Sequence, residues 1–267
     1  MDNIFQELEE HGYQIFDKNY GFEIAKDLFT EEIKELANSL IETPLNFEKH
    51  IIQSGGNKSK YTVELEKKFY DKGWKKDNLV VNRETSFKKL GITNNFETVS
   101  HEIDHIIVNK DNKCIALEIE WNTHKVFMNR DTQFWQEAWN LGAIDLSILI
   151  TFSEELQSNL EKNIFKFFKE NLNDLSELEL NGEIRLFSKR METEKNIEFN
   201  FPSAKQFSQI KSSVEKDGDF YKKVSNKFYR SKFGGTSSVV ELNKILDKGH
   251  LGRTPFIVIG LPNVGII

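Results

Sequence analysis

The spacing of apolar residues changes along the chain, from a helical period near the N-terminus to short unbroken runs further on. Apolar positions three and four residues apart predict helices over 21–43 and 61–74. Two short β-rich runs follow at 103–108 and 114–121, separated by a Lys-Asp-Asn-Lys turn at 110–113. The same criteria predict further helices over 130–141, 159–168 and 239–246, and buried strands over 146–152 and 255–261.

This alternation of strands and helices indicates an α/β fold with a mixed central sheet flanked by helices. No Gly/Ser-rich linker divides the 267 residues, so we expect a single domain over 1–267, with a helical N-terminal part over 1–56. The remaining predicted elements fall within 57–267. The composition, 38% hydrophobic and 29% charged, is that of a globular protein with a substantial core.

The chain contains a single cysteine, Cys114, which excludes an intramolecular disulfide framework and suits a reducing compartment. The N-terminus shows no signal peptide, and no apolar run reaches the roughly 18 residues that a membrane span requires. We therefore expect a cytoplasmic protein that does not contact a membrane.

The net charge of −6 argues against a protein that coats nucleic acid without specificity, because such proteins are normally basic. A DNA enzyme whose cations gather on one face remains compatible with this charge. Basic residues cluster in two segments, 67–76 and 205–232. The alternative interpretation of each cluster is a helix face that is simply exposed to solvent. We expect the second segment to contact DNA phosphates, through Lys222, Lys223 and Lys227.

Three acidic residues interrupt the two β-rich runs: Asp104 in the first, and Glu118 and Glu120 in the second. Because side chains alternate across a strand, the two glutamates share one face. A turn centred on residues 111–112 places Asp104 opposite Ile119, between them. A change of register by one residue, or a bulge, would move Asp104 onto their face.

Carboxylates are costly in a sheet of Ile, Leu, Ala and Val unless a cation compensates them. An all-oxygen set of ligands favours a hard ion such as Mg²⁺ over zinc. Such a site polarises a phosphate oxygen and lowers the pKa of a bound water. We therefore predict that Asp104 and Glu118 bind the metal and that Glu120 holds or deprotonates water or binds a second ion. The alternative is a surface hairpin whose acids are solvated.

A competing motif overlaps this region, since His101-Glu102-Ile103-Asp104-His105 matches the H-E-x-x-H signature of zinc proteases. That motif requires a helix, where both histidines lie on one face and reach one metal. In a strand the two histidines are about 13 Å apart, because each residue rises about 3.3 Å. The β-branched residues that follow favour a strand, so we expect ordinary polar positions at a strand entry.

The composite pattern resembles type II restriction endonucleases of the BglII/BamHI-like group, which have the PD-(D/E)xK nuclease fold. The resemblance covers roughly residues 60–152 and, more faintly, 249–261. The motifs that carry it are Ser100–His105, Ile115–Asn122, Asn129-Arg130-Asp131 with Trp135, and Gly142–Thr151.

The resemblance implies a homodimer that cuts both strands of a short palindromic double-stranded DNA site with Mg²⁺. It places Asp104 and Glu118 among the metal-binding acids, and Glu120 where most relatives have Lys and the BamHI-like ones have Glu. Residues 57–267 then hold the catalytic core and the DNA-binding elements. An acid from a preceding helix can complete such a site, and the candidates are Glu64, Glu66 and Glu84.

Two other functions remain compatible with these residues. One is a nuclease of the same fold that acts in DNA repair or in processing mobile elements. The other is a DNA-binding protein with a decayed site, which should bind no metal, whereas all three acids are intact in this chain.

Overall fold

The structure is a computed structural model, which describes residues 2–53, 58–121, 125–172, 180–196, 199, 201–217, 219–249 and 251–264. The helices are α1 (Asp2–Glu10), α2 (Gly21–Leu28), α3 (Thr30–Ile41), the π-helix η1 (Phe47–Ile52), α4 (Lys60–Asp71), α5 (Lys125–Asn140), α6 (Glu154–Asn171), α7 (Leu180–Lys195), α8 (Ala204–Asp217), α9 (Phe220–Phe233) and α10 (Val239–Leu246). The strands are β1 (Gln14–Lys18), β2 (Lys75–Phe87), β3 (Ile92–Val108), β4 (Cys114–Ile119), β5 (Leu146–Phe152) and β6 (Phe256–Leu261).

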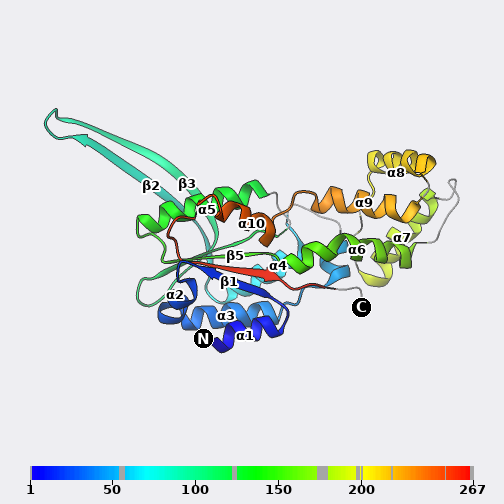
Figure 1. Ribbon diagram of the computed structural model, residues 1–267, viewed down its shortest axis with the longest axis horizontal. Helices are drawn as coiled ribbons and strands as arrows, with labels where there is room; N and C mark the ends of the chain where they lie inside the picture. The colour runs from blue at the N-terminus through cyan, green and yellow to red at the C-terminus, as the bar shows by residue number, and fades with distance from the viewer. Residues whose placement is uncertain are drawn as a thin grey trace.

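The strands form one six-stranded sheet in the order β1-β6-β5-β4-β3-β2. The three central strands β4, β5 and β6 are parallel, whereas β1 at one edge and β3 and β2 at the other pair antiparallel. Helices flank this sheet, with α1 to α3 on one side and α5 and α10 on the other (Figure 1). The predicted α/β fold with a mixed central sheet is therefore confirmed.

Every residue of β4, β5 and β6 is buried, as their unbroken apolar runs predict for strands covered on both faces. The faces of β4 contribute to two different cores. Ile115, Leu117 and Ile119 join the larger core with the N-terminal helices and α6. Cys114 and Ala116 join a smaller core against α5 and α10. The two faces of β4 therefore pack against the helical layers on the two sides of the sheet.

The predicted helix over 21–43 breaks into α2 and α3 at Phe29. The backbone of Phe29 leaves the helical region, at φ −134° and ψ 30°, while its side chain is fully buried. Burial of the aromatic ring at a bend thus overrides helical spacing. The N-terminal part also contains an edge strand, β1, which pairs with β6, so it is not entirely helical.

The largest departure from the predicted elements is the hairpin of β2 and β3, which projects from the body of the protein (Figure 1). The strand expected over 103–108 begins at Ile92, eleven residues earlier. Asn, Thr and charged residues dominate the added part, so it lacks the hydrophobic signal of a buried strand. Val81 and Ile103 are buried near its base, where Ile103 joins the smaller core.

Beyond β5, helices α6 to α9 form a helical part that extends away from the sheet (Figure 1). Phenylalanine rings hold it together: Phe168 packs against Phe187 and Phe228, with ring centroids 5.9 and 5.4 Å apart. This accounts for much of the chain's high phenylalanine content. Among the helices described, none has both the length and the hydropathy of a membrane-spanning segment.

The contact between α2 and β6 allows a stability prediction at Gly21. A Cβ atom at Gly21 would lie 2.4 Å from the carbonyl oxygen of Phe256, a clash with backbone that cannot rotate away. Gly21→Ala should therefore lower the free energy of unfolding by about 1–3 kcal/mol, as measured by urea denaturation. Gly182→Ala is the matched control, because nothing lies within 4 Å of its Cβ position in α7. That control should raise stability by up to about 1 kcal/mol, and equal effects of the two substitutions would contradict the packing described.

Candidate metal-dependent nuclease site

The structure brings Asp104 and Glu118 together across β3 and β4. These strands pair from Val108 opposite Cys114 to His105 opposite Leu117, and the next step of this register sets Asp104 opposite Glu118. The backbone N–H of Asp104 donates to Oε1 of Glu118 at 3.2 Å. Of the two arrangements that the sequence left open, the structure has the one shifted by one residue from Asp104 opposite Ile119.

The β3–β4 turn explains the difference in register. The backbone N–H of Asn109 donates to the carbonyl oxygen of Lys113 at 2.9 Å, which closes five residues rather than four. The Asn109 side-chain oxygen accepts from the backbone N–H groups of Asp111 and Lys113, both at 2.9 Å. This polar closure moves Asp104 onto the face of the sheet that carries the glutamates, the arrangement that metal binding requires.

Glu118 and Glu120 are buried carboxyl groups, with exposed fractions of 3% and 7%. Burial raises the pKa of both, and the charges of Asp104 and Asp131 raise it further. The pKa of Glu120 reaches about 8, and that of Glu118 lies well above its ordinary value. The protein's own cations thus leave this negative charge undercompensated, and a divalent cation beside these oxygens would correct the imbalance.

Lys76 on β2 is a neighbour of Asp104. From the sequence, Lys76 was recognisable only as one residue of the basic cluster over 67–76. Its Nζ lies 3.1 Å from Asp104 and 2.7 Å from Glu102. Burial alone would raise the pKa of Asp104, but the hydrogen bond and charge of Lys76 hold it below its ordinary value. Asp104 therefore carries a negative charge beside the two glutamates.

A fourth acid, the buried Asp131 on α5, lies close enough to raise the pKa of both glutamates. Its Oδ1 accepts from Nε and Nη2 of Arg130 at 2.9 and 2.8 Å, and it lies 3.3 Å from Nε2 of His101. Sequence analysis gave neither Arg130 nor Asp131 a role. They were visible only as part of the motif Asn129-Arg130-Asp131 within the resemblance.

Both histidines of the H-E-x-x-H motif lie on β3, so the zinc-protease interpretation is wrong. They face separate partners: His101 lies beside Asp131, whereas His105 is fully buried and lies 3.5 Å from Glu66. The ring of His105 also stacks on Tyr70 with centroids 5.6 Å apart. The strand geometry separates them, as expected for i and i+4 positions in a sheet.

Of the three candidate upstream acids, Glu66 on α4 is the one that shares charged neighbours with Asp104. Glu66 contacts Lys58 at 2.5 Å and His105 at 3.5 Å, and the charges of the same two residues also act on Asp104. Glu84 lies on the projecting part of β2, opposite Asn95, and is therefore remote from the acids.

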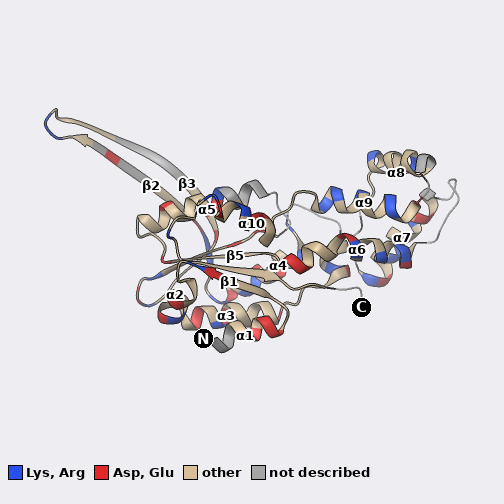
Figure 2. Ribbon diagram, in the orientation of Figure 1, with Lys and Arg blue, Asp and Glu red and all other residues tan. Residues whose placement is uncertain are grey.

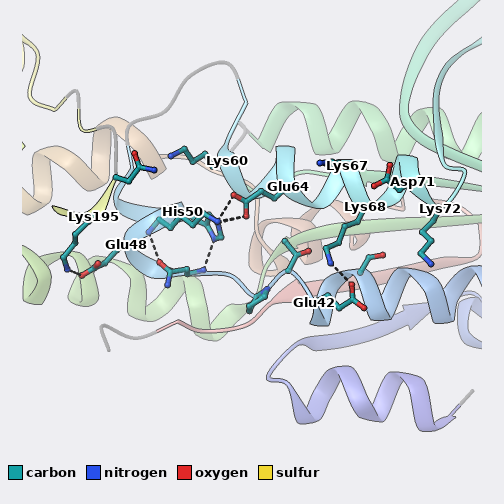
Figure 3. Close-up of a pocket in the computed structure, with 16 residues that line it drawn as sticks. Glu42, Glu48, His50, Lys60, Glu64, Lys67, Lys68, Asp71, Lys72 and Lys195 are labelled. Atoms are coloured by element: carbon teal, nitrogen blue, oxygen red, sulfur yellow. Dashed lines mark hydrogen bonds and ion pairs between the residues drawn. The ribbon is translucent and has the colours of Figure 1, made fainter. Parts of the chain in front are cut away.

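Glu64 occupies the opposite face of α4, in a separate cavity of about 960 Å³ (Figure 3). It pairs there with Lys49 at 2.8 Å and with the buried His50 at 3.4 Å. The lysines at 67, 68 and 72 line the same cavity. The basic cluster over 67–76 therefore lies in two places, and its last member, Lys76, contacts Asp104 of the acidic site.

Among the residues that the structure describes, no three Asp, Glu, His or Cys side chains are placed so that they could hold one metal ion together. The donor set nevertheless fits Mg²⁺, which binds proteins through one or two carboxylates and completes its shell with water and substrate phosphates. The residues with this chemistry are Asp104, whose backbone N–H bonds to the Glu118 carboxyl group, Glu118 itself, and Glu120, whose pKa is raised by burial and by the charges of Asp131 and Asp104.

The three predicted DNA-binding lysines lie on α9, in the helical part that extends from the sheet (Figure 1). Lys222 is exposed, while Lys223 and Lys227 line a cavity of about 320 Å³ together with Arg230. Another lysine of the same basic segment, Lys232, is half-buried instead and donates to the carbonyl oxygens of Ile51 and Gln53. The segment therefore presents cations on one side and anchors α9 to η1 on the other.

A comparison with protein families matches residues 13–261 to the family model described as "Restriction endonuclease BglII/BglIII". The match spans the whole sheet, from before β1 to the end of β6, and includes the acids described above. A search of the curated proteins found no match.

The raised pKa of Glu120 generates a prediction for the metal-free protein. A folded-state pKa of about 8, above the ordinary 4.5, means that the folded state binds this proton more tightly than the unfolded state. The stabilisation that protonated Glu120 gives the folded state is fully present below pH 4.5 and is lost as the pH rises through 8. In EDTA, wild type should lose about 2 kcal/mol of unfolding free energy between pH 6 and pH 8 relative to Glu120→Gln.

Urea denaturation at the two pH values measures this difference, and the comparison of variants cancels the groups whose pKa Glu120 does not influence. Glu84→Gln, which removes an exposed acid, is the control and should follow wild type. If wild type and Glu120→Gln showed parallel pH dependence, Glu120 would not be buried in an acidic cluster as described.

Proposed function

This chain belongs to the BglII/BglIII restriction endonuclease family, and on that premise we propose that it is a type II enzyme acting as a Mg²⁺-dependent homodimer. Membership makes it an endodeoxyribonuclease that hydrolyses double-stranded DNA at specific sites. We propose further that it cuts both strands of a short palindromic site and that residues 1–267 form one nuclease domain. A two-fold symmetric dimer suits such a site, because protein symmetry then mirrors that of the DNA.

The observation that carries the metal-dependent mechanism is the placement of Asp104 against Glu118: its backbone N–H donates to Oε1 of Glu118, and its charge raises the pKa of both Glu118 and the buried Glu120. We assign Asp104 and Glu118 as the residues that would hold Mg²⁺. When bound, the ion would polarise a phosphate oxygen and lower the pKa of a water. The carboxylate of Glu120, which is close enough for the charge of Asp104 to raise its pKa, would orient the attacking water or accept its proton.

Glu120 takes the place of the lysine found in most nucleases of this fold. Lys76 supplies an amine from another strand, 3.1 Å from Asp104. Its two ion pairs raise its pKa, so it stays protonated and balances the charge of Asp104 rather than acting as a base. A carboxylate therefore remains the group best suited to handle the proton of the water.

Mapping the fragment ends after incubation with unmethylated phage DNA and Mg²⁺ tests this function. Discrete fragments with ends at one repeated palindrome are the expected result. Ends scattered along the DNA, or confined to damaged or branched substrates, would favour a repair or mobile-element nuclease instead. Binding of DNA without cleavage in Mg²⁺ or Mn²⁺ would indicate a DNA-binding protein with a decayed site.

Removal of either proposed metal ligand should abolish cleavage without abolishing binding to DNA. We expect Asp104→Asn and Glu118→Gln each to fall below a tenth of the wild-type rate, since loss of metal activation costs far more than the roughly 1.4 kcal/mol that tenfold represents. Single-turnover cleavage and anisotropy binding provide the two readouts. Asp111→Asn, at an exposed position in the β3–β4 turn, is the control and should cleave normally. Rates above a tenth in both site variants would refute the assignment.

The lysines of α9 should contribute affinity without sequence preference, because phosphate contacts carry no direct sequence information. Substituting Ala for Lys222, Lys223 and Lys227 together should weaken binding to all duplexes and reduce the slope of log K against log salt by about 2–3. A matched control replaces the three exposed lysines of α6, at 162, 166 and 169, within the same helical part. An unchanged salt slope in the α9 variant would show that these three lysines are exposed to solvent and do not contact DNA.

A further inference from the structure

The outer part of the β2–β3 hairpin, residues 82–97, which we call the arm, projects beyond the rest of the protein (Figure 1). The β3–β4 pairing covers only 105–108, so the strands of the arm pair with each other and with no third strand. Ile92, at its tip, precedes Asp104 by 12 residues, which corresponds to about 40 Å at about 3.3 Å per residue.

Every side chain described between Glu84 and Asn94 is exposed. Three of them are large and apolar: Phe87, Leu90 and Ile92 are 63%, 70% and 48% exposed. No atom lies within 4 Å of a Cβ position at Gly91 in the tip turn. A two-stranded ribbon without a packing partner is only marginally stable in water. The arm therefore exposes apolar surface that the chain itself does not cover, which indicates an interaction site.

The charge of the arm differs from that of the whole protein. Residues 82–97 contain three cations (Arg83, Lys88 and Lys89) and two acids (Glu84 and Glu97), a net charge of +1, whereas the whole chain carries −6. Two of the cations are adjacent at the tip, where Figure 2 shows them in blue. Six of the other residues are Asn, Ser or Thr, which can donate hydrogen bonds to phosphate oxygens or base edges.

These features distinguish two possible occupants, duplex DNA and a second copy of the chain. Three exposed apolar side chains offer far less than the roughly 800 Å² per partner of a stable protein interface. A basic, polar two-stranded ribbon instead matches the dimensions of the DNA major groove, which admits such a ribbon. The arm also continues from β3, the strand that carries Asp104, so one strand joins the arm to the acids.

We propose that the arm binds duplex DNA that flanks the cleavage position, with Lys88 and Lys89 on phosphates and Phe87 and Leu90 against sugars or base edges. This inference rests on the proposed function, and it adds a contact region outside the cut site. At 3.4 Å per base pair, a reach of about 40 Å corresponds to about 12 base pairs. Affinity should therefore depend on how far the duplex extends.

The test measures binding of random-sequence duplexes of 10, 20 and 40 base pairs by anisotropy, in EDTA so that no cleavage occurs. The first variant carries Lys88→Ala and Lys89→Ala, and the second replaces residues 83–96 by Asn-Gly, a two-residue hairpin turn that preserves the base at Val81 and Ile103. The control carries Lys26→Ala and Lys34→Ala, which remove two exposed lysines from α2 and α3 on the opposite side of the sheet (Figure 1).

On 40 base pairs, both arm variants should bind on the order of tenfold more weakly than wild type, and the salt slope of the lysine variant should fall by about 2. On 10 base pairs, all proteins should bind alike, and the control should match wild type throughout. Wild-type affinity and salt slope in both arm variants would overturn the proposal. Should the shortened protein not fold, as judged by circular dichroism, the lysine variant decides.

Sedimentation velocity identifies the other occupant. If shortening the arm converted a dimer to a monomer while the salt slope of the lysine variant stayed unchanged, the arm would contact a second copy, and the proposal would be wrong. These outcomes remain separate from failure of the nuclease function. A wild-type protein that binds no duplex at all would contradict DNA cleavage itself, whereas arm variants indistinguishable from a binding wild type contradict only the arm contact.

Discussion

The pairing of β3 with β4 is the constraint on which the site depends. A five-residue turn closed by Asn109 sets His105 opposite Leu117, and the next step sets Asp104 beside Glu118. A slip of one residue would turn Asp104 to the opposite face of the sheet. The register is secure because Ile115 and Leu117 are buried in the larger core, while Ala116 lies in the smaller one. Packing on both faces of β4 thus fixes the position of the acids.

The same packing creates the electrostatic problem that a metal would solve. Glu118 and Glu120 follow an apolar strand into a buried region, where Asp104 and Asp131 add like charge. Lys76 and Arg130 balance the outer acids, Asp104 and Asp131, directly. The glutamates between them retain raised pKa values, as is common where a protein binds a cation or performs acid–base chemistry. Family membership supplies the reaction that such a site would serve, the hydrolysis of DNA.

The sequence predicted the parts of this structure that rest on strong hydrophobic signals. The strands β4, β5 and β6 and helix α10 appear where apolar runs and spacing indicate them. It did not predict the register, because Asn109 closes the turn through side-chain hydrogen bonds that hydrophobic pattern does not report. Neither did it predict the arm, where Lys88, Thr93 and Asn94 face solvent, nor Asp131, which reaches the site only through the placement of α5. The acids were identifiable because carboxylates in an apolar strand are unusual; their partners come from distant segments.

Metal binding by the acidic cluster is the central claim, and titration calorimetry with Mn²⁺ tests it most directly. The measurement uses EDTA-dialysed protein without DNA, in buffers of different ionisation enthalpy, so that proton release is counted along with binding. We predict that wild type binds Mn²⁺ at pH 7 and releases protons, because the raised pKa values leave carboxyl protons to displace. Glu118→Gln should bind much more weakly. Equal binding by wild type and Glu118→Gln, or no binding by wild type, would contradict the account.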